Sequence, residues 1–361
     1  MTNPARNLIF CFDGTRNHPR DAEEQRTLFG LGEPEDIGIT NVLKLHIFLG
    51  GGLSDNDEPF SRDPRQHSCY YSGVGTHGDD TFTRAFNVIF APVSLDVRLI
   101  LNRAGNDLRR SYRPGDRVFL FGFSRGAAIA RRFASVLPHY LPHDTDTRGI
   151  VHFLGVFDTV AAMGLDWIGE KPALDVVFEH GNTLSPTVAR AVHLIALDEQ
   201  RRAFAPTLFN QDPRVTEIWF PGAHADVGGG FKNDGLSDIA LAHMLSCLTG
   251  LRTGVNVLPL DAIDYSRLSD PAGEWRIERD DLEIDADPFA DIHYADGWLP
   301  SDRLLTPRKV HVLREGRPAY GPDTGANIDR SVFLRRERWR DYAHDALFPD
   351  DPPLNGSASR G

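Results

Sequence analysis

Short apolar runs alternate with amphipathic and polar stretches through residues 8–250. The runs are rich in Val, Ile, Leu, Phe and Tyr, and turn-forming residues bound them, which is typical of buried β-strands. By this criterion we expect strands at Leu8–Phe12, Ser68–Tyr71, Val118–Phe121, Ile150–Phe157, Ala191–Leu197 and Glu217–Phe220, with one more beyond the alternating region at Lys309–Leu313.

Several of the stretches between these runs have the spacing of a helix. From Ser94 to Tyr112 apolar residues recur every four or five positions with Arg and Asp between them, and Pro114-Gly115 ends the pattern. Further helices are expected at Asn41–Leu49, from Ser124 to about Val136, at Ser237–Thr249 and, in part, at Ser331–Ala346. Strands that alternate with helices predict an α/β fold with a doubly wound, mainly parallel sheet.

The same pattern divides the chain into three regions. We expect an α/β core over residues 1–250, an irregular C-terminal extension packed on it over 251–348, and a disordered tail at 349–361. The core has a mixed insertion at 161–188 that is a candidate lid. Its apolar residues, Trp167 and Phe178 among them, suit the lining of an acyl pocket and structural packing equally well.

Composition and charge narrow the classes of function. The chain has 361 residues with a net charge of −12, and it lacks a basic block long enough to follow a phosphate backbone, so we expect no nucleic-acid partner. Its three cysteines, Cys11, Cys69 and Cys247, are far apart, which suits a reducing compartment and gives no metal-ligand spacing. The N-terminus lacks the apolar stretch of a signal peptide, and no apolar run approaches 18 residues. We therefore expect a protein that is cytoplasmic as synthesised, with any export following a signal-independent route.

The strongest local motif is Gly122-Phe-Ser-Arg-Gly126, between a predicted strand and a predicted helix. This is the nucleophile elbow, which lifts a serine hydroxyl out of a strained turn, and here the serine is Ser124. Gly122 and Gly126 remove side chains that would clash where strand and helix approach. The Arg125 amide would face a developing oxyanion from the helix N-terminus. The plain alternative is a glycine-containing turn with an inert serine.

A serine nucleophile needs a base and an orienting carboxylate. Ligands of parallel sheets bind at the carboxyl ends of the strands, and five chemically active residues fall there. These residues are Asp13, Ser124, Asp158, Asp198 and His224.

Among the histidines, His224 is the one directly after a late strand, so we expect it to be the base. A histidine that only packs against the Gly-rich turn is the plain alternative. For the acid, the residues themselves favour Asp158 and Asp198 equally. Asp226, which could instead cap the turn, comes third.

Three interpretations fit Asp13-Gly14-Thr15 after the first strand. A phosphatase pattern would need aspartate at the position of Cys11, and a phosphate-cradling turn would leave the elbow unexplained. We prefer the third, in which Gly14 or Thr15 supplies the second oxyanion-hole amide while Asp13 and Asn17 hold the turn. A turn held by those two side chains without any catalytic role is the plain alternative.

Seven blocks of the sequence together resemble a known family. They are Phe12-Asp-Gly-Thr-Arg-Asn17, Tyr71-Ser-Gly-Val-Gly-Thr76, Tyr112-Arg-Pro-Gly-Asp116, Gly122-Phe-Ser-Arg-Gly-Ala127, Gly155-Val-Phe-Asp-Thr-Val160, Ala196-Leu-Asp-Glu-Gln-Arg-Arg-Ala-Phe204 and Trp219-Phe-Pro-Gly-Ala-His-Ala-Asp-Val-Gly-Gly-Gly230. In this order they resemble the uncharacterised α/β-hydrolase group that includes the catalytic domain of the first family of type VI secretion lipase effectors. The resemblance covers roughly residues 8–250.

The resemblance implies a triad of Ser124, Asp158 and His224, which resolves the choice of acid in favour of Asp158. It implies a serine esterase of the lipase or phospholipase A type that needs no metal or other cofactor. Its expected partners are a lipid or other small ester as substrate, a membrane surface in transient contact, and a secretion-system or immunity protein. Two rival functions are a metal-dependent phosphoester hydrolase centred on Asp13, Asp158 and Asp226, and a non-catalytic binding module on a hydrolase scaffold.

Overall fold

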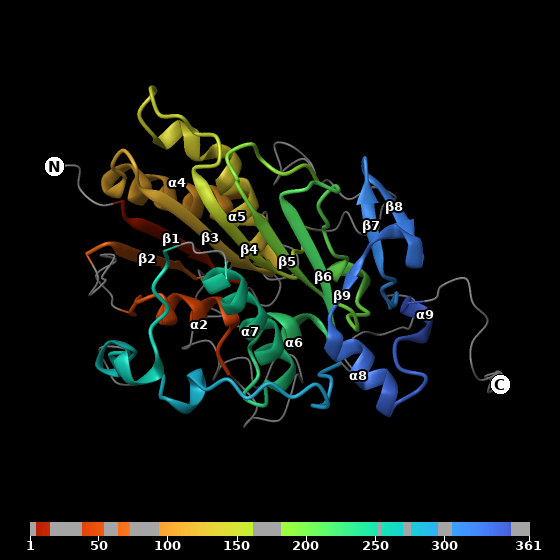
Figure 1. Cartoon of the computed structure of the whole chain (residues 1–361). Helices are drawn as coiled ribbons and strands as arrows, with labels where there is room; N and C mark the ends of the chain where they lie inside the picture. The colour runs from red at the N-terminus through yellow and green to blue at the C-terminus, as the bar shows by residue number, and fades with distance from the viewer. Residues whose placement is uncertain are drawn as a thin grey trace.

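The computed structural model of the chain contains one large parallel sheet. It describes residues 5–14, 38–53, 64–72, 94–161, 182–250, 254–269, 276–294 and 305–347. Within these ranges the strand order is β2-β1-β3-β4-β5-β6-β9, and every neighbouring pair is parallel (Figure 1). The strands are β1 (Asn7–Phe12), β2 (Gln66–Tyr71), β3 (Arg117–Phe123), β4 (Val151–Phe157), β5 (Ala191–Ala196), β6 (Val215–Phe220) and β9 (Asn327–Ile328).

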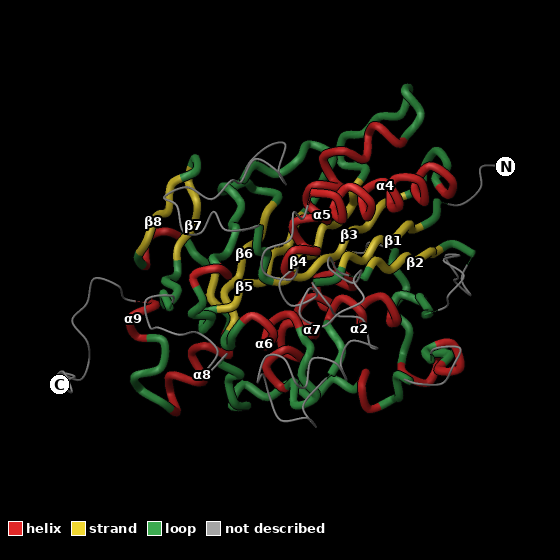
Figure 2. Tube along the Cα trace, turned by 180° about the vertical axis from the view of Figure 1, so that it is seen from behind, coloured by secondary structure: helices red, strands yellow, loops and turns green. Residues whose placement is uncertain are grey.

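Helices cover both faces of this sheet. Figure 1 shows α4 (Ser94–Ser111) and α5 (Ser124–Val136) on one face, with α2 (Asn41–Phe48) and α7 (Gly235–Gly250) on the other, and Figure 2 shows the same layers from behind. Alternate residues of β1 enter the two cores, because Phe10 packs with Phe133 of α5 while Ile9 belongs to the cluster that contains Leu43 and Leu241. Burial on both faces explains why the central strands β1, β3, β4 and β5 are mostly apolar. The predicted doubly wound, mainly parallel sheet is confirmed.

The order of the strands reverses between β1 and β3. The chain leaves β1 for β2 on one side and then crosses to β3 on the other side. Such a switch point is where open α/β sheets bind ligands, outside the carboxyl ends of the strands. Phe12 pairs with Gly122 in the register of these strands, so the residues after β1 lie beside those after β3.

The C-terminal region contributes to the main sheet as well as to a separate hairpin. Ile328 of β9 pairs with Trp219 of β6, at the end of the sheet where the blue elements gather in Figure 1. Trp219 is buried in a third apolar cluster with Val310 and Val332. The elements here are the antiparallel pair β7 (His311–Arg314) and β8 (Arg317–Tyr320), and the helices α8 (Arg330–Arg338) and α9 (His344–Leu347).

Most predicted elements are present with ends shifted by a few residues. The strand expected at Lys309–Leu313 is β7, which lies outside the main sheet. Three features that were not predicted are β8, the two-residue strand β9, and the short helix α6 (His224–Gly228). Single 3-10 turns occur at Leu137–Tyr140, Arg202–Phe204, Leu260–Ala262, Tyr265–Arg267, Asp280–Leu282 and Pro322–Thr324.

Parts of two predicted segments lie outside the described residues. These parts are 162–181 of the candidate lid, which include Trp167 and Phe178, and the whole tail at 349–361. Of the helices that the structure describes, none combines the length and the apolar character that crossing a membrane requires.

Candidate active site

Ser124 stands at a sharp strand-to-helix turn at the end of β3. It is the first residue of α5, its φ is +57°, and its neighbours leave it 7% exposed. A Cβ on Gly122 would lie 2.6 Å from the Ala127 Cα, and a Cβ on Gly126 would lie 2.2 Å from the Phe12 carbonyl oxygen. Both glycines are therefore required for the close approach of β3, α5 and the end of β1.

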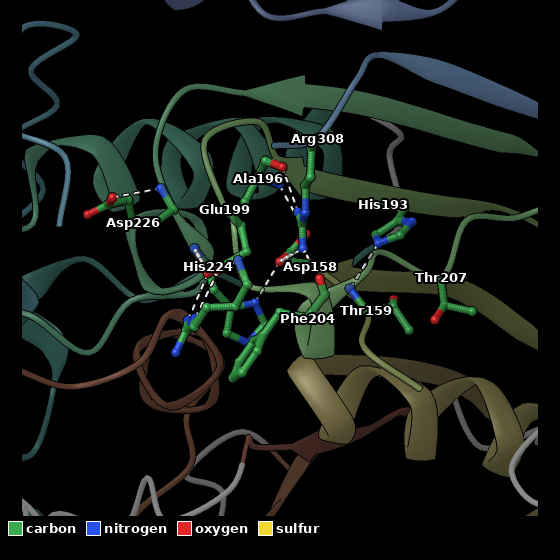
Figure 3. A network of polar contacts seen from close by, with 12 residues as sticks. Asp158, Thr159, His193, Ala196, Glu199, Phe204, Thr207, His224, Asp226 and Arg308 are labelled. Carbon is green, nitrogen blue, oxygen red and sulfur yellow. Dashed lines mark hydrogen bonds and ion pairs between the residues drawn. The ribbon is translucent and has the colours of Figure 1, made fainter. Parts of the chain in front are cut away.

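His224 and Asp158 meet across the carboxyl end of β5. Asp158 directly follows β4 with a φ of +36°, and His224 begins α6 after β6. The imidazole Nδ1 lies 2.5 Å from Asp158 Oδ2, as Figure 3 shows. The next residue, Thr159, donates its N–H to His193 Nε2 at 3.0 Å, which anchors the turn that carries Asp158.

Two phenylalanines enclose the His224 ring. The Phe123 ring lies with its centroid 4.6 Å away, and the Phe204 ring meets the imidazole edge-on at 4.9 Å. Phe123 is the residue before Ser124, so the His224 ring lies next to the elbow. Ser124 Oγ itself has no hydrogen-bond partner in the described structure. Catalytic hydrogen bonds are often long without substrate and tighten when it binds.

The Asp158 carboxylate is fully buried and has several donors. Arg308 Nη1 donates to Oδ1 at 2.7 Å, Arg308 Nη2 donates to Oδ2 at 3.0 Å, and the Ala196 N–H donates to Oδ1 at 3.1 Å. Burial alone would raise the pKa of Asp158, but the Arg308 charge and the His224 hydrogen bond hold that pKa well below its usual range. Asp158 is therefore a carboxylate at neutral pH.

Burial lowers the pKa of His224, against the raising effects of Asp158 and of Glu199. Glu199 Oε2 accepts the His224 backbone N–H at 3.3 Å, and Arg201 pairs with Glu199 at 2.7 Å. The imidazole is consequently neutral near pH 7. Because Nδ1–H donates to Asp158, the lone pair is on Nε2, where a base needs it.

The other two predicted acids have different partners. Asp198 Oδ2 accepts the Gly222 N–H at 2.7 Å and the Tyr342 hydroxyl at 2.6 Å. Asp226 Oδ2 accepts the Ala223 N–H at 2.8 Å, and Asp226 Oδ1 lies 2.6 Å from His293 Nδ1. Figure 3 shows Asp226 away from the His224 ring. The structure therefore brings Asp158 to His224, and leaves Asp198 and Asp226 holding turns and the C-terminal region.

Asp13 holds the turn after β1. Its carboxylate accepts the Gly14 N–H at 2.7 Å, the Thr40 hydroxyl at 2.6 Å and the Tyr70 hydroxyl at 2.6 Å. The Gly14 N–H is thus already engaged in this structure. Thr15, the other predicted source of an oxyanion-hole amide, lies outside the described residues, as does Asn17.

The predicted Arg125 donor belongs to the first turn of α5. Backbone N–H groups in a first turn have no partner within the helix and lie at its positive end. The Arg125 amide therefore belongs to the positive end of α5, directly after Ser124.

The carboxylates of the phosphoester-hydrolase alternative do not come together. Asp13 binds Thr40, Asp158 binds Arg308, and Asp226 contacts His293. Across the described ranges, no three side chains of the His, Cys, Asp and Glu types are arranged to hold a metal ion.

Sequence reasoning missed three residues around His224. Glu199 and Phe204 lie in one of the blocks that carry the family resemblance, but nothing in their spacing indicates contact with a histidine. Arg308 lies 150 positions from Asp158 and in no motif. The one available signal was physical, because a buried carboxylate is usually paired with a cation or with several hydrogen-bond donors.

Comparison with known proteins shows that most of the chain matches one protein family. The model of the family described as the T6SS phospholipase effector Tle1-like catalytic domain matches residues 6–140 and 142–247. Uncharacterized protein YEL023C of Saccharomyces cerevisiae is 25% identical over 269 residues, which are 60% of this chain and 35% of the yeast protein.

Two solved structures are similar to the chain at low sequence identity. An uncharacterized protein from Pseudomonas aeruginosa is 20% identical with a TM-score of 0.43, and the match covers 78% of this chain and 49% of that one. The Tle1 effector bound to the VgrG spike of the type 6 secretion system is 21% identical with a TM-score of 0.37, and the match covers 63% and 52%. The chain thus spans about a third of the yeast relative and about half of each solved chain.

The family match extends over more than half of the chain and contains the elbow, Asp158 and His224. The parallel, doubly wound sheet confirms the α/β-hydrolase-like fold class predicted from the sequence. The chain belongs to the family of Tle1-like phospholipase effector catalytic domains of the type VI secretion system.

Proposed function

We propose that the chain is a serine esterase that hydrolyses carboxylic esters of lipids through an acyl-enzyme. The observation that carries the proposal is the 2.5 Å contact between His224 Nδ1 and Asp158 Oδ2, beside a serine held in left-handed backbone. Ser124 is the nucleophile, His224 the general base and Asp158 the group that orients the imidazole. Membership of a phospholipase effector family supports a lipid ester as substrate.

The reaction proceeds in two halves. His224 Nε2 takes the proton of Ser124 Oγ as that oxygen attacks the ester carbonyl carbon, and Asp158 stabilises the resulting imidazolium. His224 then gives the proton to the leaving alkoxide, and an alcohol departs from the acyl-enzyme. In the second half a water molecule loses a proton to His224 and attacks the acyl carbon. His224 returns that proton to Ser124 Oγ as the bond to the acyl carbon breaks and the acid is released.

The oxyanion formed in each half receives backbone donors. The Arg125 N–H is the first, and the Thr15 or Gly14 N–H is the second in this proposal. For Gly14 to serve, its N–H has to leave the Asp13 carboxylate that it contacts at 2.7 Å. A single donor of this kind is worth on the order of 3 kcal/mol in the transition state. Neither half requires a metal or cofactor.

We also propose where the enzyme acts and with which partners. A lipid substrate requires transient contact with a membrane surface. The solved Tle1 effector is bound to the VgrG spike, and this supports a secretion-system partner and delivery without a cleaved signal. An immunity protein that blocks the site in the producing cell fits the same role.

Labelling with a fluorophosphonate probe tests the chemistry directly. We expect the wild type to label, and Ser124→Ala and His224→Ala to lose labelling by at least about 100-fold while they remain folded. Asp226→Asn, which alters a carboxylate away from the His224 ring, is the matched control and should label. Absence of wild-type labelling both in buffer and in detergent would refute the proposal. A panel of phospholipid and neutral ester substrates then defines the substrate class.

A further inference from the structure

A buried arginine of the C-terminal extension holds the proposed catalytic carboxylate. Arg308 is 7% exposed, and its Nη1 donates to Asp158 Oδ1 and to the Ala196 carbonyl at 2.7 and 2.6 Å. Its Nη2 donates to Asp158 Oδ2 at 3.0 Å and to the Phe204 carbonyl at 2.5 Å. Figure 3 shows Asp158 between Arg308 and His224.

This arrangement fixes the direction in which the carboxylate faces His224. A guanidinium fork bound to both oxygens sets the plane of a carboxylate as well as its position. Asp158 Oδ2 accepts from Arg308 Nη2 and lies 2.5 Å from His224 Nδ1, so the two groups share one oxygen. The Phe204 backbone is also held by Arg308, and the Phe204 ring packs edge-on against the imidazole. The Arg308 side chain therefore holds both Asp158, which contacts the His224 ring at Nδ1, and Phe204, whose ring packs against it.

We propose that Arg308 is a positioning residue for the esterase reaction, whose guanidinium aligns the Asp158 carboxylate with His224, so that the working active site includes the C-terminal extension. The family match ends at residue 247, and Arg308 lies 61 residues beyond it (308 − 247). The inference rests on the proposed function of Ser124, Asp158 and His224.

The proposal has an electrostatic consequence for the base. Asp158, Glu199 and Arg201 act on the charge of His224, and Arg308 binds the same Asp158 oxygen that contacts the imidazole. Removal of Arg308 takes one positive charge from this set, which favours the imidazolium. The acid limb of activity should then move to higher pH by about one unit or more, the order of shift that a single neighbouring charge produces.

Three variants separate positioning from structural support. Arg308→Met removes the charge and the fork, and Arg308→Lys keeps the charge without the fork. Arg335→Met is the matched control, because Arg335 is a buried arginine of the same extension whose Nη1 donates to the Pro288 and Ala290 carbonyls at 2.8 and 2.7 Å. The readouts are kcat, KM and the pH profile with a chromogenic short-chain ester, together with the rate of fluorophosphonate labelling.

We expect Arg308→Met to lower kcat by at least about 100-fold with KM changed less than threefold, and to raise the acid limb. Arg308→Lys should fall between it and the wild type. Arg335→Met should keep the wild-type profile and lose stability alone. A folded Arg308→Met or Arg308→Lys protein with wild-type kcat and profile would overturn the inference, as would a loss of kcat matched by Arg335→Met.

Chemical rescue adds a test that a structural role would not pass. Arg308 lines an open cavity of about 600 Å³, so a small cation can reach its place in Arg308→Ala. Millimolar guanidinium should raise the labelling rate of Arg308→Ala at least tenfold, whereas sodium chloride and urea should not. A failure of rescue together with an unmoved pH profile counts against positioning. If the wild type itself does not label, the proposed function fails and this inference with it; if the wild type labels and the Arg308 variants match it, this inference alone fails.

Discussion

Replacement of Asp158 by Asn should cost both stability and activity, for separable reasons. Asn has nearly the same shape and tolerates the φ of +36° at this position. Its neutral amide, however, leaves the buried Arg308 charge without a counter-charge, which costs about 3–5 kcal/mol when one partner of a buried pair is removed. Its NH₂ group must also face a donor of either Arg308 or His224. We expect kcat to fall by about 10⁴-fold, as in other triads that lose this charge.

A double-mutant cycle isolates the pair. Arg308→Met leaves a carboxylate that is 0% exposed without its cation, so it should cost a similar 3–5 kcal/mol or so. The double variant Asp158→Asn/Arg308→Met removes both charges and should be less destabilised than the sum of the single variants by at least about 3 kcal/mol. Its activity should stay as low as that of Asp158→Asn, because the orienting carboxylate is gone.

Urea unfolding at pH 7, followed by the fluorescence of buried Trp219, measures the free energy of unfolding of the two single variants and the double variant relative to the wild type. Because the folded pKa of Asp158 lies below the unfolded value of about 3.9, its stabilisation is complete above that pH and declines as pH falls toward the folded pKa. The difference in unfolding free energy between the wild type and Asp158→Asn should therefore become smaller below about pH 4. If the effects of the two single variants add up to that of the double variant within about 0.5 kcal/mol, the coupling between Asp158 and Arg308 is refuted.

Three other changes have definite expected outcomes. Gly126→Ala places a Cβ 2.2 Å from the Phe12 carbonyl oxygen and should destabilise the fold by about 3 kcal/mol or more in thermal unfolding, whereas Gly250→Ala, which has open space, should be nearly neutral. The buried Lys44 ammonium pairs with the carboxylates of Asp234 and Asp238. Lys44→Met leaves both carboxylates without this cation and should lower the free energy of unfolding in urea by about 3–5 kcal/mol. A loss under about 1 kcal/mol would contradict a stabilising role for Lys44. Because burial lowers the pKa of His224, the acid limb of kcat/KM should lie below pH 6.5; a limb above that value would contradict the assignment.

The elbow and the ends of the strands were predictable because their signals are local. A strand that reads Val118 to Phe121, followed by glycines on either side of Ser124, allows few other structures. Alternation of strands and helices then places every strand end on one edge of the sheet. His224 followed from this geometry, although the short helix that it begins did not.

The choice between Asp158 and Asp198 could not be made from the residues alone. Both come shortly after neighbouring parallel strands, and the register that sets them three residues apart is not visible in the sequence. What separates them is backbone direction, because Asp158 has left-handed φ while Asp198 turns its carboxylate to the Gly222 N–H. Arg308 was out of reach for another reason, since its contact with Asp158 joins segments 150 residues apart.

The strand that the extension adds to the main sheet escaped prediction because it is short. Strand β9 has two residues and no apolar run, and its pairing with β6 depends on a neighbouring cluster around Trp219. Short edge strands of this kind are determined by packing more than by local propensity.

Two of the three proposed catalytic residues, Ser124 and Asp158, have left-handed backbone, in which most side chains are strained by about 1–2 kcal/mol. Ser124 Oγ has no hydrogen-bond partner in the described structure, so its loss breaks no contact of that kind. Ser124→Gly should therefore raise the thermal midpoint while it ends catalysis. A library of variants screened only for heat resistance would discard the serine early, and one screened for ester cleavage would keep it.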